Sequence, residues 1–183
     1  PITLLCCDNI RENGKMLEKS LISYLKLCND IDLINWIKKN VTFPSCMVDR
    51  ITPRSPANLP DEISEKFKII EKSSVMAEPF IQWVIEDKFI DERPRLEEVG
   101  VDFVTNIIPY EEAKIRILNA GHLVLSYFGV LNNYKTYDQT IKDEKLKKFF
   151  FNFQRLEAIP ALGNDIPFDL EEYMLVIFDR FNN

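Results

Sequence analysis

The sequence predicts a mixed α/β structure over residues 1–108, followed by an all-helical structure over residues 109–183. Short apolar or β-branched runs alternate with helical patterns in the first part, whereas apolar residues recur at helical spacing through most of the second. The composition, 46% hydrophobic and 28% charged, is typical of a folded protein that buries a core. A length of 183 residues fits one domain or parts of two.

The first elements follow from apolar spacing and turn residues. Residues 2–7 form an unbroken apolar run, which predicts a strand buried on both faces. The polar pair Asp8-Asn9 follows at its carboxyl end, where open α/β sheets bind ligands. Helical spacing then predicts a helix over about residues 13–27, and Asp30 is a suitable N-cap for a second helix to about Lys39.

The middle of the chain is predicted to be extended and then helical. Residues 41–53 are rich in β-branched residues and contain two prolines, so we expect extended chain, followed by a proline-rich linker over residues 54–60. A short helix over about residues 61–72 precedes strands at 80–87 and 101–104. Pro109 opens the longest helical stretch, to about residue 132, and further helices are expected at 143–156 and 169–181.

Charge and hydropathy restrict the partners of the chain. A net charge of -6 and a pI near 5.0 argue against binding to nucleic acid or to an anionic membrane. No window approaches the roughly 20 apolar residues of a membrane span, and no signal peptide opens the chain, so we expect a cytoplasmic protein. The sequence begins at Pro1 directly on an apolar run, which indicates a piece of a longer protein.

The cysteines and the histidine offer no familiar metal site. The four cysteines match neither a C-x-x-C pair nor a disulfide framework, and we expect them to be reduced and mostly buried: Cys6, Cys7, Cys28 and Cys46. His122 is the only histidine, so no zinc ligand set is formed. We therefore expect any chemistry of this chain to be metal-free.

Four polar residues share one face of the helix that follows Pro109. At about 100° per residue, with Lys114 at zero, Glu111 lies near about 60°, His122 near about 80° and Asn119 near about 140°. Leu118 and Leu125 lie on the same face, so Lys114 would be desolvated and its pKa lowered. An ordinary helix with a Glu111–Lys114 pair and a buried histidine is the competing interpretation, and spacing alone favours it.

A desolvated lysine on such a face suits alcohol oxidation. Lys114 would remove the alcohol proton as a general base, and Glu111 would relay that proton to solvent. Asn119 would donate to the developing alkoxide, with Asn9 as the second amide, and His122 would contact a neighbouring substrate hydroxyl. The competing interpretation of Asn9 is a turn residue paired with Asp8.

Taken together, these segments resemble the long-chain mannitol dehydrogenase family, which includes mannitol 2-dehydrogenase and fructuronate reductase, also called mannonate oxidoreductase. The resemblance spans nearly the whole chain. Its most specific part is K-I-R-I-L-N-A-G-H at residues 114–122, a K-x-x-x-x-N-x-x-H pattern. Further matching segments are residues 7–14, 40–44, 47–51, 78–80 and 82–87.

The resemblance implies site residues and a cofactor. Lys114 would be the general base, Asn9 and Asn119 the oxyanion hole, Glu111 the proton relay, and His122 a substrate contact. Asp49 falls on the M-V-D-R segment near the family's active site and would bind substrate, although a buried pair with Arg50 is the commoner arrangement. The family uses NAD, with NADP possible.

The resemblance also implies how the chain is organised. Residues 1–108 would be the last part of a Rossmann-type dinucleotide-binding domain, and residues 109–183 the first part of a helical substrate domain. The five glycines never occur as G-x-G, so the cofactor's phosphate loop is not in this chain and its cofactor-binding residues stay unknown.

Two functions from different classes are compatible with the sequence. The first is a dehydrogenase that interconverts a sugar alcohol or aldonate with its keto form, either D-mannitol with D-fructose or D-mannonate with D-fructuronate. Its partner would be a small sugar alcohol, ketose or uronate, and this piece alone is expected to be inactive. The second is a non-catalytic binding or scaffold module derived from the same fold.

Overall fold

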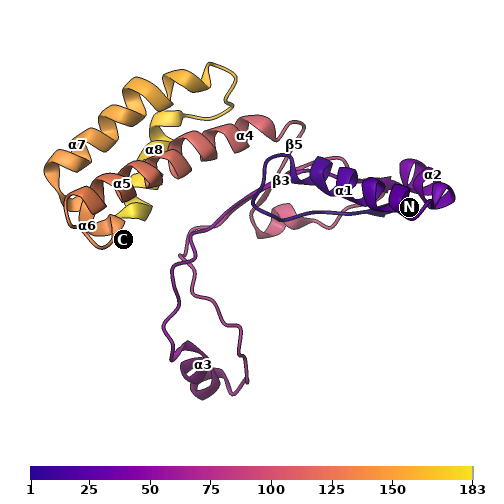
Figure 1. The fold of residues 1–183 in the computed structure, drawn as a ribbon, viewed down its shortest axis with the longest axis horizontal. Coiled ribbons are helices and arrows are strands. Elements are labelled where there is room, and N and C mark those ends of the chain that lie inside the picture. The colour runs from indigo at the N-terminus through magenta and orange to yellow at the C-terminus, as the bar shows by residue number, and fades with distance from the viewer. Residues whose placement is uncertain (183) are drawn as a thin grey trace.

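The chain folds into an α/β part and a helical part, which lie at opposite ends of an elongated molecule (Figure 1). The structure is a computed structural model and describes residues 1–182, so Asn183 at the end of the expected second domain lies outside the described residues. Helices α1 and α2 lie at one end, α5 to α8 at the other, and a small sheet lies between them. The predicted fold class is confirmed.

The first unit contains two short parallel strands and two helices. Strand β1 (Ile2–Thr3) pairs in parallel with β2 (Val41–Thr42), and α1 (Asn13–Leu27) and α2 (Ile31–Asn40) connect them. The Asp30 carboxylate accepts a hydrogen bond from Leu33 N–H at 3.0 Å, as expected of an N-cap. The predicted strand over residues 2–7 is wrong in length and burial, because β1 pairs on one edge only and Ile2 is exposed.

The central sheet has the order β3-β4-β5. Strand β3 (Cys46–Asp49) runs antiparallel to β4 (Gln82–Glu86), which runs parallel to β5 (Val101–Val104). Cys46, Ile85 and Val101 pack on one face of the sheet, and Met47, Val84 and Ile107 on the other. Burial on both faces explains why these strands appear in the sequence as apolar runs.

A buried asparagine joins the first unit to the sheet. The Asn13 side chain is fully buried, donates to the carbonyls of Cys46 and Asp8, and accepts from Cys46 N–H. At Gly14 a Cβ would lie 2.4 Å from the carbonyl oxygen of Phe43, so only glycine allows this approach. These contacts fix the loop after β1 beside the start of β3.

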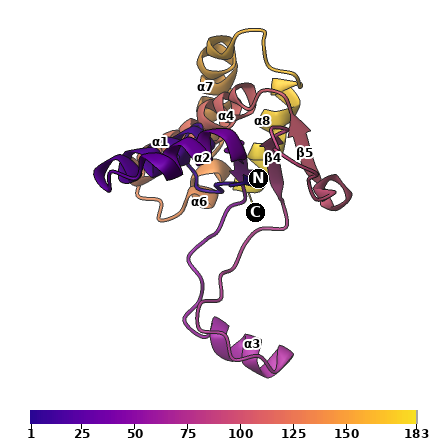
Figure 2. The same ribbon diagram turned by 90° about the vertical axis from the view of Figure 1, so that its right-hand side faces the viewer.

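Between β3 and β4 the chain makes a long excursion that extends away from the rest of the molecule (Figures 1 and 2). It carries helix α3 (Leu59–Phe67), which begins with a proline in its first turn and ends at Lys68 in the left-handed conformation, φ 58°. The helix therefore begins and ends earlier than the predicted 61–72. Several large apolar side chains on this excursion are exposed, Ile70 most of all at 87%.

The helical part starts after the 3₁₀ turn η1 (Leu96–Val99) and strand β5. One continuous rod contains α4 (Ile108–Ala113), a π-helical turn η2 (Lys114–Asn119) and α5 (Ala120–Leu131). There follow α6 (Tyr137–Lys142), α7 (Glu144–Phe153), a second π-turn η3 (Gln154–Ala158), the 3₁₀ turn η4 (Pro160–Leu162) and α8 (Leu170–Phe181). The rod matches the helix predicted from Pro109, whereas α6 and both π-turns were not predicted.

The core of the helical part lies between the rod, α7 and α8. Ile117 and Leu125 from the rod pack with Phe150 of α7 and with Ile177 and Phe181 of α8, all nearly or fully buried. Aromatic pairs link the same helices, including Phe150 with Phe181 at 6.1 Å between ring centroids. This packing holds the rod and therefore the face that carries Lys114.

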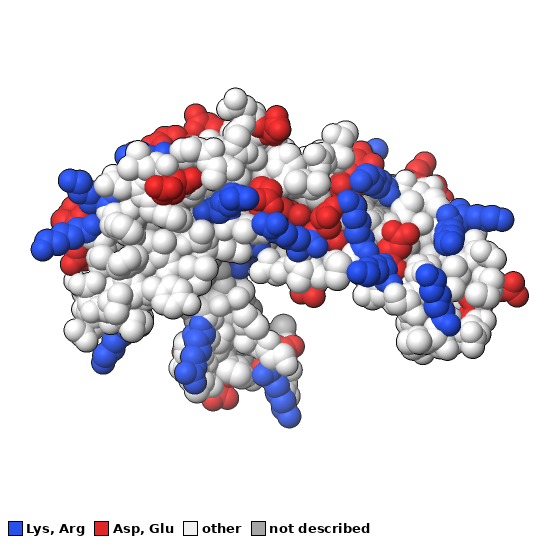
Figure 3. Space-filling view, turned by 45° about the horizontal axis from the view of Figure 1, so that its top comes forward, with Lys and Arg blue, Asp and Glu red and all other residues white. Residues whose placement is uncertain are grey.

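Surface features bear on the remaining predictions. On the face shown in Figure 3, acidic and basic side chains are interspersed. No helix within residues 1–182 is long and apolar enough to cross a membrane.

The expectation of mostly buried cysteines is wrong, because Cys7 and Cys28 are exposed and only Cys46 is buried. Over the same residues no group of three or more His, Cys, Asp or Glu side chains is arranged to hold a metal ion.

Candidate active site

Three segments that are distant in the sequence meet on one side of the rod. They are the loop after β1, the end of β3, and η2, which is part of the rod itself. Two adjoining cavities of about 290 and 500 Å³ lie there, near the usual size of small-molecule sites. Lys114, Asn119, Asn9 and Val48 line both of them. The first also includes Glu111, and the second Asp49, so the structure brings five of the six predicted residues together.

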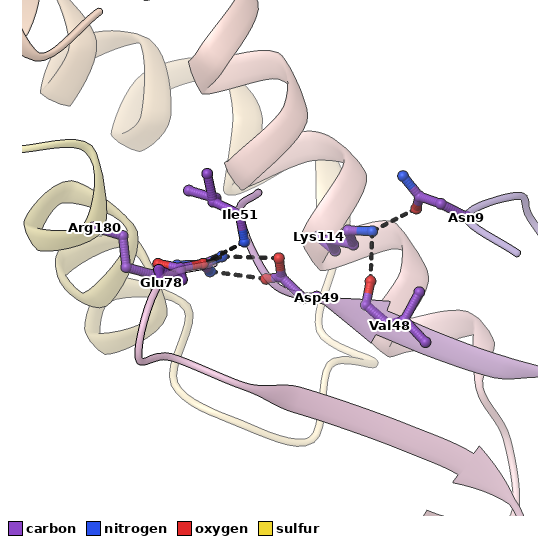
Figure 4. Close-up of polar contacts among 7 residues, drawn as sticks. All are labelled: Asn9, Val48, Asp49, Ile51, Glu78, Lys114 and Arg180. Carbon is purple, nitrogen blue, oxygen red and sulfur yellow. Dashed lines mark hydrogen bonds and ion pairs between the residues drawn. The ribbon is translucent and has the colours of Figure 1, made fainter. Parts of the chain in front are cut away.

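The amine of Lys114 lies at the centre of this meeting point. Its Nζ donates to Asn9 Oδ1 at 2.6 Å and to the carbonyl of Val48 at 2.8 Å (Figure 4). The side chain is buried, and burial lowers its pKa below the ordinary 10.5. The negative charge of Asp49 opposes this shift, whereas the positive charge of Arg180 adds to it.

Asn9 belongs to a turn and also contacts the lysine. Its backbone N–H donates to Asp8 Oδ1 at 2.9 Å, and the Ile10 N–H donates to the Asp8 carbonyl at 2.9 Å, so Asn9 lies in a tight turn with Asp8. Its side-chain oxygen nevertheless accepts from Lys114. Because the oxygen is used in this way, the Nδ2 group is left to donate to a ligand in the cavity.

The π-turn changes the relation between Lys114 and Asn119. Ala120 N–H bonds to the carbonyl of Ile115, five residues earlier, as expected of a π-turn. Residues five apart in such a turn lie closer together around the axis than in an ideal α-helix, where about 140° separates them. The angle predicted for Asn119 assumes regular α-helical spacing, whereas in the structure Asn119 and Lys114 line the same two cavities.

Glu111 lies one turn before Lys114 and faces the same cavity. Its Oε1 accepts from the backbone N–H of Glu12 at 2.9 Å, so the predicted alternative, an ion pair with Lys114, is not formed. Burial raises the pKa of Glu111, partly offset by the hydrogen bond from Glu12. A carboxyl group with a raised pKa beside an amine is suited to carrying a proton.

His122 lies apart from the two cavities. Its ring packs edge-on against Tyr137, with 4.9 Å between centroids, and lies 5.8 Å from Phe181. The residue is exposed, so the buried histidine of the competing interpretation is not formed, and partial desolvation by these rings lowers the pKa of His122. It does not line either cavity, so its predicted substrate contact depends on a ligand that extends along the rod beyond Asn119.

Asp49 forms a buried ion pair, but not with the predicted partner. Both carboxylate oxygens accept from Arg180 at 2.8 Å, and Arg180 also contacts Glu78 at 2.7 Å (Figure 4). The alternative pair with Arg50 is wrong, because Arg50 is exposed and donates to the carbonyl of Glu78. Glu78 also accepts from Ile51 N–H at 2.6 Å, which ties the strand end to this cluster.

Sequence reasoning missed Arg180, Glu78 and Val48. Arg180 lies 131 residues after Asp49 on a helix whose pattern is otherwise apolar and acidic. Nothing in its local sequence separates it from a basic residue that suits the last turn of a helix. Glu78 belongs to the matched segment 78–80, which is the one signal that marked it. Val48 acts through its carbonyl group, which has no sequence signature.

Comparison with known proteins assigns both parts of the chain. Residues 1–98 match the family model of the mannitol dehydrogenase Rossmann domain, and residues 106–183 that of the mannitol dehydrogenase C-terminal domain. The chain is 43% identical over its whole length to D-arabinitol 4-dehydrogenase of Klebsiella pneumoniae and covers 40% of that protein. It is 37% identical to D-mannonate oxidoreductase of Escherichia coli, with 99% of the chain and 37% of that protein covered.

Solved structures have the same fold. A substrate-free D-sorbitol dehydrogenase is 38% identical, with a TM-score of 0.89. Mannitol 2-dehydrogenase of Pseudomonas fluorescens, in a ternary complex with NAD and D-mannitol, is also 38% identical, with a TM-score of 0.83. Both matches cover the whole chain and 37% of the other chain. The chain thus spans about two fifths of the length of the relatives that it matches.

Proposed function

The chain belongs to the mannitol dehydrogenase family, and from this premise we propose that it is part of an NAD(P)-dependent, metal-independent oxidoreductase. The reaction interconverts a sugar alcohol or aldonate with its keto form. Lys114 is the general base. The observation that carries this proposal is the placement of a buried lysine amine between two neutral hydrogen-bond acceptors in a cavity wall.

Lys114 is prepared to exchange one proton with a substrate. A neutral amine has two N–H groups and one lone pair, and the two N–H groups suit Asn9 Oδ1 and the Val48 carbonyl. The third position is then a lone pair that accepts the hydroxyl proton of the alcohol. In the reverse direction the same position carries the proton that is returned to the keto oxygen.

Asn9 and Asn119 supply the donors for the oxygen that becomes an alkoxide. Asn9 Nδ2 is left to donate because its Oδ1 accepts from Lys114. Asn119 lines the same cavities and is half-buried. Fixed donors of this kind stabilise developing negative charge without reorganising solvent.

The remaining predicted residues assist the proton and the substrate. Glu111, whose pKa is raised by burial, relays the proton between Lys114 and solvent. Asp49 lines the second cavity and binds substrate hydroxyl groups. A carboxylate accepts about four hydrogen bonds, so the two from Arg180 leave room for a substrate hydroxyl. His122 contacts a hydroxyl further along the substrate.

These residues account for part of a nicotinamide cofactor site only. Within residues 1–182 no G-x-G turn is present, so the described chain supplies no loop of that kind for the cofactor's phosphates. It supplies the cavity beside the loop after β1, which Asp8, Asn9 and Arg11 line. A bound nicotinamide would supply the acceptor for the hydride of the carbinol carbon and, in the reverse direction, its donor.

The named relatives define the substrate class to be tested. They act, by their names, on D-arabinitol, on D-mannonate and on mannitol. We propose a straight-chain polyol or the corresponding aldonate, with D-mannitol/D-fructose and D-mannonate/D-fructuronate as the leading pairs. A substrate carboxylate would need a further cation, because Arg180 is already occupied by Asp49 and Glu78.

The decisive experiment uses the complete protein that contains this chain. Reduction of NAD⁺ and of NADP⁺ is followed by absorbance with D-mannitol, D-arabinitol, D-sorbitol and D-mannonate. We expect turnover with at least one of them, and a loss of about 10²–10⁴-fold in kcat for Lys114→Met, the usual contribution of a general base.

Lys88→Met is the matched control. Lys88 is largely exposed, pairs with Glu86 outside both cavities, and is expected to leave kcat unchanged. Full turnover in the Lys114→Met protein would refute the assigned base. Absence of turnover with every polyol and aldonate, while the protein is folded, would instead favour a binding or scaffold module.

A further inference from the structure

A side chain from the segment after α7 donates a hydrogen bond to the backbone of η2, the π-turn of the rod. Gln154 Nε2 donates to the backbone carbonyl of Ile117 at 2.8 Å, and both residues are fully buried. Ile117 lies within η2, between Lys114 and Asn119. The Ile117 carbonyl also accepts from the Ala120 N–H, and its second lone pair is open to an outside donor such as Gln154.

The helix packing provides space for this glutamine. Gly121 lies on the rod just after η2, and a Cβ at that position would lie 2.5 Å from Gln154 Nε2 and 2.8 Å from Phe150 Cε2. A glycine in a helix interior is less favourable than alanine, because it loses more backbone freedom on folding. The chain therefore contains an unfavourable residue at the position where the glutamine approaches the rod.

The side chain of Gln154 also has an unfavourable feature. Its Oε1 is buried and has no hydrogen-bond partner within residues 1–182. A buried acceptor without a partner lowers stability, and an apolar residue of similar size avoids that penalty. Gln154 also begins the second π-turn, in which Ile159 N–H bonds to its carbonyl at 2.9 Å. Stability alone thus gives a poor account of glutamine at this position.

We infer that Gln154 is a positioning residue, which holds η2 in its π-helical form and thereby sets Asn119 beside Lys114. The inference rests on the proposed function. In a regular α-helix the amide of Asn119 would lie about 140° around the axis from Lys114. The π-turn removes most of this separation, and both side chains then line the same two cavities. Gln154 touches neither the cavities nor Lys114 and acts only through the Ile117 carbonyl.

The test substitutes Gln154 in the complete protein. Gln154→Met has a similar length and no donor, and we expect kcat to fall about 10–100-fold, since a displacement of about 1 Å costs up to about 10²-fold. KM should change less than kcat, because substrate contacts away from the reacting oxygen are kept. Gln139→Met, at an exposed glutamine on α6, is the matched control and should behave as the parent protein.

A second readout does not depend on turnover. The pH dependence of acylation of Lys114 by acetic anhydride, measured by mass spectrometry, reports the pKa of its amine in the absence of cofactor. We expect the pKa of Lys114 to move in Gln154→Met and to stay at the parent value in Gln139→Met. A purely structural role of Gln154 would lower the melting temperature and leave this pKa unchanged.

Gln154→Glu provides the conservative variant. When protonated, its carboxyl group donates to the Ile117 carbonyl, and when ionised it cannot. At each pH the kcat of Gln154→Glu is compared with that of the parent protein. We expect the two to be nearly equal at low pH and the variant to fall below the parent as pH rises. If Gln154→Met is folded and keeps either the parental kcat or the parental Lys114 pKa, the inference is overturned. If both variants fail to fold, Gln154 serves stability and the inference is likewise overturned. Inactivity of the parent protein with every substrate contradicts the proposed function, whereas an unchanged Lys114 pKa in a folded variant contradicts this inference.

Discussion

Two buried cations lie on either side of the end of strand β3, and their surroundings differ in one respect. Lys114 donates to an amide oxygen and a backbone carbonyl, both neutral. Arg180 donates to two carboxylates, those of Asp49 and Glu78. Burial lowers the pKa of Lys114. It also acts to lower the pKa of Arg180, but the hydrogen bonds and charges of the two carboxylates outweigh it and raise that pKa.

The difference fits the proton exchange proposed for Lys114 and a structural role of Arg180. A buried amine with neutral partners loses its proton more easily, because nothing nearby compensates the charge fully. A guanidinium between two carboxylates stays charged and fixes their positions. The neighbouring residues Val48 and Asp49 thus serve opposite purposes, one facing the amine through its carbonyl and the other facing the guanidinium through its side chain.

The largest expected effect is on stability and concerns Arg180. Arg180→Met leaves the carboxylates of Asp49 and Glu78 buried without their cation, and we expect the free energy of unfolding to fall by about 3–5 kcal/mol. Lys114→Met should change it by no more than about 1.5 kcal/mol, because the lost hydrogen bonds are offset by removing a buried amine. Urea unfolding of the complete protein measures both.

Arg155 offers the control for this contrast. It pairs with Glu171 near the surface, and Arg155→Met should leave the unfolding midpoint unchanged. If Arg180→Met and Lys114→Met destabilise the protein equally, the two cations do not differ as described.

The next largest effect is expected when Lys114 is given a carboxylate partner like those of Arg180. Asn9→Asp places a carboxylate where Lys114 now has an amide oxygen, and it removes one of the two proposed oxyanion donors. We expect kcat for alcohol oxidation to fall about 10²–10³-fold, the usual effect of losing one oxyanion donor. The pH midpoint of the remaining activity should rise, because the new charge favours the protonated amine.

Asn9→Ala separates the two contributions. It removes the same donor but adds no charge, so its kcat should fall similarly while its pH midpoint stays nearer the parent value. An Asn9→Asp protein with the parental midpoint would show that Lys114 does not titrate in the reaction.

The smallest effect is a shift in the pH profile. In the proposed mechanism alcohol oxidation needs the neutral amine of Lys114, so its rate should rise with pH through a pKa below 10.5, and keto reduction should fall over the same range. Asp49 raises the pKa of Lys114 through its charge, so Asp49→Asn should move both midpoints to lower pH. Initial rates in both directions across the pH range check the sign, and movement to higher pH would contradict it.

Local pattern was enough to predict most elements. Helix α1, the Asp30 cap of α2 and strand β5 follow from apolar spacing and capping residues, which act over a few neighbouring positions. The short strand β1 was overestimated, since an apolar run does not reveal whether a strand has neighbours on both edges. Helix α6 is one and a half turns long and too short to show a period.

The candidate site was predicted in composition but not in geometry. The K-x-x-x-x-N-x-x-H pattern gave Lys114, Asn119 and His122, and the turn after β1 gave Asn9. Their spatial relation depends on η2, and a π-turn has no reliable local sequence signal because it is held by packing and by the Gln154 hydrogen bond. The partner of Asp49 lies 131 residues away and depends on where α8 packs.

The sequence by itself determined the order of most elements, the residue types at the site and the absence of a G-x-G turn, since these depend on identity and near-neighbour spacing. Only the tertiary structure decided that Arg180 binds carboxylates and that Lys114 donates to neutral oxygens. That decision sets how readily each cation releases its proton, because electrostatic effects depend on distance and burial, and neither is encoded in spacing along the chain.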